Sequence, residues 1–190
     1  MLLKSLLAQV LVFMLTACAS QVPARTTKAD SGPCGALTLD ECMSLMDRQQ
    51  MGDVQRVGTL MAAGAANLSK DNPSAAKIYF DEVVKQDADN AEAYFMLANS
   101  EAALALEAQQ KNNALDDALA SASYAIAGVD YVRAISLDPN NQAAYLGAVA
   151  VFAQSGGCDL ARSLGEAHRA RFGQNDKQAS LSGIIQKKCK

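Results

Sequence analysis

An internal repeat constrains the fold of this chain more than any other feature of its sequence. The chain matches itself at an offset of 51 residues, and the shared residues are small, aromatic or turn-forming. Hydrophobic residues make up 50% of the chain but aromatic residues only 5%, and the surplus is mostly alanine, which is typical of close-packed helices. A repeat of this length predicts stacked helical units that bury their apolar faces against one another. The matching pairs are Ala76/Ala127, Phe80/Tyr131, Asp87/Asp138, Asn90/Asn141, Ala93/Ala144, Tyr94/Tyr145 and Ala102/Ala153.

The residue types inside the repeat resemble those of the tetratricopeptide repeat, a unit of two antiparallel helices. A small residue followed four positions later by an aromatic one, in Ala76–Phe80 and Ala127–Tyr131, matches its second helix, and Tyr94–Ala98 matches its first. Asp138–Asn141 matches the turn that closes such a unit. Small residues let two helices approach closely, while an aromatic side chain fills the groove towards the next pair. The resemblance, over about residues 53–173, implies an all-α fold: a right-handed α-solenoid of about three helical hairpins with N-terminal and C-terminal capping helices.

The middle hairpin is expected to be longer than its neighbours. The ordinary unit has 34 residues, so a period of 51 residues places 17 more between Tyr94 and Ala127. Leucines continue the apolar pattern through this stretch, from Leu104 to Leu119, and residues 111–113 (Lys-Asn-Asn) form a natural turn. We therefore expect both helices of the middle hairpin to gain about two turns and to project beyond the other hairpins.

Hydrophobic periodicity and capping residues predict eight helices. The three hairpins are expected at residues 53–87, 91–138 and 142–173, with a C-terminal capping helix at residues 176–189. Thr38 is the expected N-cap of the first helix, so the helical domain would extend over residues 38–190. The expected helices are Leu39–Gln50, Asp53–Lys70, Ser74–Gln86, Ala91–Gln110, Ala114–Leu137, Gln142–Gln154, Asp159–Arg171 and Lys177–Lys188.

The amino terminus has the layout of a secretory signal peptide. Lys4 precedes a largely apolar run over residues 6–15. A transmembrane helix is the alternative, but this run is about half of the ~20 residues needed to span a bilayer. The segment Leu15–Cys18 (Leu-Thr-Ala-Cys) resembles the lipobox of bacterial lipoproteins, in which small residues precede a cysteine that becomes lipid-modified. The resemblance implies a signal peptide of residues 1–17 and a lipid anchor on Cys18.

The residue that follows the expected anchor is Ala19, and it bears on the final membrane. In Gram-negative lipoproteins an Asp at this position retains the protein in the inner membrane, so the resemblance implies the outer membrane, facing the periplasm. Several acyl chains on one cysteine would hold a protein at a membrane almost permanently. Residues 18–37 are rich in Pro, Ser, Thr and Gly without periodicity, and we expect them to form a flexible tether.

Four cysteines remain in the expected mature chain besides the anchor, and an even number in an exported protein predicts two disulfides. Three pairings are possible. Cys158 and Cys189 stand at the open end of the last expected hairpin, because the midpoint between them falls in its turn, so the two should lie side by side. Cys34 and Cys42 would then close a small loop on the first turn of the first helix. A zinc site is the alternative, but the chain has no Cys-x-x-Cys pair and a single histidine.

Motifs that carry catalysis are missing from the sequence, which contains no Gly-x-Ser-x-Gly, phosphate-binding glycine loop, His-Glu-x-x-His or calcium loop. His168 has no partner constellation, and Asp116 and Asp117 are expected to form a solvated helix face. The net charge of −3 argues against a nucleic-acid partner, which would need a basic stripe. We therefore expect no enzyme activity, cofactor, metal or small-molecule substrate. The alternative, an enzyme with an unrecognised site, requires a deep pocket with converging polar groups.

Stacked helical hairpins offer a concave face, lined by their first helices, to an extended peptide or a helix. The projecting hairpin is a second candidate surface. The lipid anchor and the repeats together resemble the pilotin and assembly lipoproteins of type IV and tight-adherence pili, which bind a secretin subunit. The resemblance implies a membrane-anchored adaptor whose partner is a secretin or another envelope-complex subunit; the alternative is a scaffold that recruits periplasmic cell-wall hydrolases or proteases. The residues expected to line the binding face are Met61, Phe95, Asn99, Leu146 and Ala150.

Overall fold

The computed structural model of the chain describes residues 32–111 and 113–190. The expected signal peptide (1–17), Cys18 and the greater part of the expected tether lie outside the described residues. Among the residues that are described, no helix is both long enough and apolar enough to cross a bilayer.

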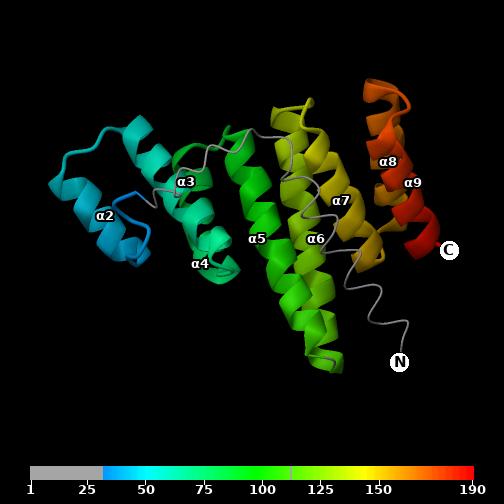
Figure 1. The fold of residues 1–190 in the computed structure, drawn as a ribbon, viewed down its shortest axis with the longest axis horizontal. Helices are drawn as coiled ribbons and strands as arrows, with labels where there is room; N and C mark the ends of the chain where they lie inside the picture. Colours follow the sequence, from blue (N-terminus) through cyan, green and yellow to red (C-terminus); the bar gives the residue numbers. More distant parts are fainter. Residues whose placement is uncertain (1–31, 112) are drawn as a thin grey trace. The chain divides into compact units, whose positions relative to one another are not determined.

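Over these residues the chain is entirely helical, which confirms the predicted all-α class (Figure 1). Each end of each helix lies within two residues of its predicted position. The helices are α2 (Leu39–Arg48), α3 (Asp53–Ser69), α4 (Pro73–Gln86), α5 (Ala91–Gln110), α6 (Ala114–Leu137), α7 (Gln142–Ser155), α8 (Cys158–Phe172) and α9 (Asp176–Lys188).

Side-chain caps explain why most of the helices begin where they do. Thr38 and Glu41 form a complete capping box at the start of α2, in which each side chain binds the backbone N–H of the other residue. Asparagine caps five further helices by accepting a hydrogen bond from the N–H three residues later. These asparagines are Asn72, Asn90, Asn113, Asn141 and Asn175.

The two repeat-related turns have equivalent hydrogen bonds. Asn90 Oδ1 accepts from Ala93 N at 2.9 Å, and Asn141 Oδ1 accepts from Ala144 N at 3.0 Å. The aspartate three residues before each asparagine, at positions 87 and 138, accepts from the backbone N–H two residues further on. The residues that repeat in the sequence thus form the same hydrogen bonds in both turns, so α5 and α7 start from matching turns.

Successive helices pack against each other from α3 to α9 (Figure 1). A second set of contacts joins α3 with α5, α5 with α7, and α7 with α9. Within the described part of the chain, no contact of similar extent joins α4 with α6 or α6 with α8. The odd-numbered helices therefore form a row on one side, with their neighbours more widely spaced on the other.

The repeat-related aromatic residues lie between one pair of helices and the next, and each requires a glycine beside it. Phe80 of α4 is fully buried beside Leu97 of α5, and a Cβ on Gly64 would stand 2.7 Å from its ring. Tyr131 of α6 lies against α7, where a Cβ on Gly147 would stand 2.3 Å from its ring. Real Cβ atoms do not approach that closely, so both positions are restricted to glycine by packing.

The middle pair of helices is elongated, as the length of the repeat predicts. Helix α5 has 20 residues and α6 has 24, against 14 in each of α4 and α7. The added length is unequal, because α6 gains almost three turns and α5 less than two at about 3.6 residues per turn. The prediction of about two added turns in each helix is therefore right for the pair as a whole but not for each helix.

Both predicted disulfides are present. Cys34 bonds to Cys42 and Cys158 to Cys189, with Cα–Cα distances of 5.2 and 5.4 Å. The first holds the segment before α2 against that helix; in the same segment, Gly35 O accepts a hydrogen bond of 2.9 Å from Lys70 Nζ. The second joins the first residue of α8 to the residue after α9. Covalent links therefore close the described helical region at both ends.

Candidate functional site

The structure distributes the five predicted binding residues over three helices of one row. Met61 lies in α3, Phe95 and Asn99 lie in α5, and Leu146 and Ala150 lie in α7. All five are half-buried. Each therefore contributes to packing between helices and still has part of its surface in solvent, as a preformed binding face requires.

Two of these residues, Phe95 and Asn99, meet around the buried Tyr131. The Tyr131 hydroxyl donates a hydrogen bond of 2.6 Å to Asn99 Oδ1, and the rings of Phe95 and Tyr131 lie 5.9 Å apart between centroids, tilted by 57°. Burial raises the pKa of the Tyr131 phenol, so the hydroxyl remains a donor. The amide NH₂ of Asn99 contacts the sulfur of Met96 at 3.9 Å.

The other three predicted binding residues lie on α3 and α7. Met61 packs beside the core residues Phe80 and Leu97. Leu146 packs on the core that surrounds Tyr131 and Tyr145. Phe95 and Leu146 thus pack on one core cluster, while Met61 packs on another.

A charged cluster between α4, α5 and α6, centred on the buried Glu101, was not predicted from the sequence. Lys77 Nζ lies 2.6 Å from Asp81 Oδ2 and 3.5 Å from Glu101 Oε1, and Glu101 is only 6% exposed. Asp130 of α6 adds a third carboxyl group, whose negative charge acts on Glu101. The one local signal was a glutamate at the centre of an otherwise apolar face of α5.

The cluster contains carboxyl groups whose pKa values are shifted upward. Burial, reinforced by the negative charge of Asp130, raises the pKa of Glu101 to about 7, and burial also raises the pKa of Asp130. Burial alone would lower the pKa of Lys77, but the hydrogen bond and the charge of Asp81, together with Glu101, outweigh it and raise that pKa. Near neutral pH the Glu101–Asp130 pair therefore holds a proton between two helices.

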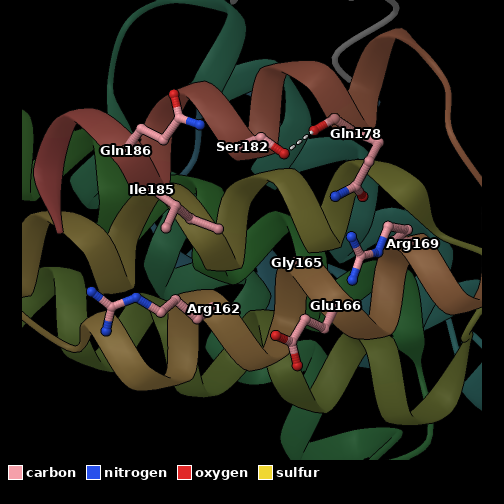
Figure 2. A pocket seen from close by; sticks show the side chains of 8 residues that line it. All are labelled: Arg162, Gly165, Glu166, Arg169, Gln178, Ser182, Ile185 and Gln186. Atoms are coloured by element: carbon pink, nitrogen blue, oxygen red, sulfur yellow. Dashed lines mark hydrogen bonds between the residues drawn. The ribbon is translucent and has the colours of Figure 1, made fainter.

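A cavity of about 240 Å³ lies between α8 and α9 (Figure 2). Arg162, Glu166 and Arg169 of α8 line one side, and Gln178 and Ser182 of α9 lie on the other, where Ser182 Oγ donates to the backbone carbonyl of Gln178 at 3.0 Å. Arg162 is already engaged, because it donates to Cys189 O at 2.8 Å and pairs with Asp159. The lining is mostly charged and polar, whereas small-molecule sites are mostly apolar with a few polar groups.

His168, the single histidine, is fully buried and serves packing. Its Nδ1–H donates to Gln178 Oε1 at 2.8 Å, and its ring lies between Tyr145 and Phe172. It therefore links α7, α8 and α9, while the described residues include no group of three or more His, Cys, Asp or Glu that could hold a metal ion.

No protein-family model matches the chain, and no curated protein is significantly similar to it in sequence.

The second surface considered from the sequence, the projecting pair of helices, is apolar on α6. Leu115 is 71% exposed and Leu119 is 52% exposed, whereas Leu106 on α5 is half-buried. The exposed leucines lie close to the turn between Gln110 and Ala114. This surface is separate from the row of α3, α5 and α7 that carries the predicted binding residues.

Proposed function

We propose that the chain is a lipid-anchored adaptor of the periplasmic face of the outer membrane, which binds a subunit of a pilus or secretion complex and assists its assembly or localisation. The partner that this function implies is a secretin subunit. The helical pairs would form a right-handed solenoid of tetratricopeptide type, with α3, α5 and α7 on its concave side.

The row formed by α3, α5, α7 and α9 supports the solenoid. Helices on the inner side of a curved stack lie closer together than those on the outer side. Contacts join members of this row to each other, and no contact of similar extent is present between α4 and α6 or between α6 and α8 in the described region. The equivalent turns at Asp87–Asn90 and Asp138–Asn141 support a repeated unit.

The observation that carries the binding function is the half-exposed apolar surface of this row around Phe95. Its ring is held against Tyr131, which is fixed in turn by its hydrogen bond to Asn99. A side chain held in place before binding loses little conformational entropy when a partner packs on it. Phe95 and Leu146 would thus be the apolar anchors for an extended peptide or helix of the partner.

The anchor on Cys18 explains how a binding surface without chemistry of its own acts. Tethering raises the effective concentration of a weak binder beside a partner in the same membrane. The lipid would therefore supply much of the binding strength that a small surface lacks.

Site-directed photo-cross-linking in the envelope tests this function. A photo-reactive benzoylphenylalanine in place of Phe95 should yield an adduct with a secretin subunit, whereas the same residue in place of Ile78, which is 50% exposed on α4, should not. Adducts of Phe95 with soluble cell-wall hydrolases or proteases would favour the scaffold alternative. In parallel, deletion of the gene should reduce secretin multimers in the outer membrane, and normal multimers would contradict the proposal.

A further inference from the structure

Glu101 of α5 is buried at a place where an ionised carboxylate is poorly accommodated. Its Oε2 atom is buried and has no hydrogen-bond partner among the described residues. Its other oxygen, Oε1, lies 3.5 Å from Lys77 Nζ, and that amine lies closer, at 2.6 Å, to Asp81 Oδ2. Because a buried charge without hydrogen bonds is costly, the packing favours the protonated form of Glu101.

One lysine faces three carboxyl groups in this cluster. Helix α4 supplies Lys77 and Asp81, and α6 supplies Asp130, whose negative charge acts on Glu101. Of the other helices that pack on α5, α7 has no acidic or basic residue. The two charged residues of α3 lie in its first turn, where the arginine pairs with Asp47 of α2. Full ionisation of the cluster therefore leaves two negative charges in excess, whereas one bound proton leaves a single one.

The cluster changes its charge in the neutral pH range. Burial, together with the charge of Asp130, raises the pKa of Glu101 to about 7, and burial also raises the pKa of Asp130. The pair therefore holds a proton below about pH 7 and loses it above. Once the proton is lost, the two carboxylates repel each other across the interface between α5 and α6.

The charged cluster lies at the same level of the α5–α6 pair as the hydrogen bond behind Phe95. Asn99 and Glu101 are two residues apart on α5, and Tyr131 directly follows Asp130 on α6. At about 1.5 Å per residue, the two cross-helix pairs lie within about 3 Å of each other along the helix axes. The bond of 2.6 Å between Tyr131 and Asn99 spans the same two helices, so a change in their spacing at Glu101 also reaches this bond.

Asn99 and Glu101 border the interface with α6 from opposite sides. At about 100° per residue, their side chains point roughly 200° apart around α5. Between these two directions lie the buried Ala98 and Ala105, which share a core cluster with residues of α6. Small residues let two helices approach closely, so packing here depends strongly on the spacing of the helices. The charged cluster and the hydrogen bond are thus coupled through that spacing and not through direct contact.

We propose that proton binding by Glu101 and Asp130 regulates the binding face around Phe95. With the proton bound, α5 and α6 close together, and the ring of Tyr131 is held in place behind Phe95. Without the proton, repulsion between the two carboxylates loosens α5 from α6 and removes this support. The inference rests on the function proposed for the row of α3, α5 and α7 and adds its regulation: the partner binds more tightly at pH 6 than at pH 8.

Nuclear magnetic resonance tests the device without a partner, on the chain from residue 18 onward with Cys18→Ser. The rings of Phe95 and Tyr131 lie 5.9 Å apart between centroids, and the NOE between them should fall at least twofold from pH 6 to pH 8, with a midpoint near 7. Glu101→Gln stays neutral and should abolish this transition, whereas Glu107→Gln, at an exposed position of the same helix, should leave it unchanged. A constant NOE in the native chain, or an equal fall in Glu101→Gln, would overturn the proposal.

Two further variants test the sign of the charges, and they decide the matter even if Glu101→Gln fails to fold. The charge of Asp130 raises the pKa of Glu101, and the charge of Lys77 lowers it. Asp130→Asn should therefore move the midpoint of the NOE transition to lower pH, and Lys77→Met should move it to higher pH. Shifts in the reverse directions, or an unmoved midpoint in both variants, would show that another group drives the transition and would overturn the proposal.

Photo-cross-linking in isolated envelopes separates this inference from the proposed function. Benzoylphenylalanine in place of Leu146 leaves Phe95 intact and should give several-fold more adduct with the secretin subunit at pH 6 than at pH 8. In Glu101→Gln the two yields should be equal. Equal yields in the native chain would overturn the regulation while supporting the proposed function. An NOE transition with no adduct at either pH would support the proton-linked contact while overturning the proposed function.

Discussion

The hydroxyl of Tyr131 on α6 donates a hydrogen bond of 2.6 Å to Asn99 Oδ1 on α5. This bond holds the tyrosine ring against which Phe95 packs. Tyr131→Phe removes this bond and leaves the amide oxygen to find water, so we expect a loss of about 1 kcal/mol in the free energy of unfolding. Urea denaturation measures it. Tyr94→Phe is the matched control, because no hydrogen bond of the Tyr94 hydroxyl is found among the described residues; an equal loss in both variants would contradict the role of the bond.

The pKa of Glu101 predicts how stability depends on pH. A carboxyl whose pKa is raised to about 7 on folding stabilises the protein fully below its unfolded pKa near 4.5 and loses that contribution as the pH rises through about 7. The free energy of unfolding should therefore fall by roughly 3 kcal/mol at most between pH 5 and pH 8. Glu101→Gln, which stays neutral, should flatten this dependence.

Denaturation of the Glu101→Gln variant at several pH values checks this expectation. Glu107→Gln serves as the control, because Glu107 is an exposed residue of the same helix. The prediction fails if Glu101→Gln loses stability towards pH 8 as steeply as the unmodified chain does.

Replacement of Gly147 should destabilise the protein by overpacking. A Cβ at this position would stand 2.3 Å from the Tyr131 ring, which is held by its hydrogen bond and cannot turn away. We expect Gly147→Ala to cost about 1–3 kcal/mol, measured by thermal or urea denaturation. Gly183→Ala in α9 has nothing within 4 Å and should instead be neutral or slightly stabilising, because alanine favours a helix. Equal effects at the two positions would argue against close packing at Gly147.

The disulfide between Cys158 and Cys189 should contribute more stability than the one between Cys34 and Cys42. Its loop spans 31 residues against 8, and the entropy that a cross-link removes from the unfolded chain grows with loop length. Paired Cys→Ser replacements should cost roughly 3–4 kcal/mol for the longer loop and about 2–3 kcal/mol for the shorter one. Denaturant midpoints of the two double variants test the order, and the reverse order would contradict it.

Cys18→Ser should separate folding from function in cells. The two disulfides of the described helical region are formed by other cysteines, so we expect the variant to fold and keep its thermal stability. Without a lipid anchor it should fail to support secretin assembly, because the local concentration beside its partner is lost. Complementation tests with normal protein levels measure this; full complementation by the variant would remove the anchor from the proposed mechanism.

The helix boundaries were predictable because their causes are local. Asn90 and Asn141 cap the helices that follow them, and such caps can be recognised in the sequence without knowledge of the fold. The pairing of Cys158 with Cys189 was predictable because the two cysteines lie at equal distances from the turn of one hairpin. Only the position of that turn had to be known. Both kinds of inference use residues that act on their immediate neighbours.

The buried charges and the exposed face of α6 could not be inferred in this way. Glu101 and Asp130 are 29 positions apart, and nothing in either segment indicates that they face each other. Leu115 and Leu119 have the spacing of core residues, yet both are exposed, because periodicity identifies an apolar face without showing whether another element covers it. The unequal lengths of α5 and α6 likewise depend on where the turn near Asn113 falls.

The matching turns before α5 and α7 limit where insertions and deletions can be accepted during the evolution of this protein. Asn90 caps the start of α5 and Asp138 caps the end of α6, and both residues belong to turns shared with the neighbouring helices. Any length added to or removed from the pair must therefore emerge at the opposite end, near Asn113. Insertions and deletions there alter the reach of one pair of helices and leave the registration of all the others unchanged.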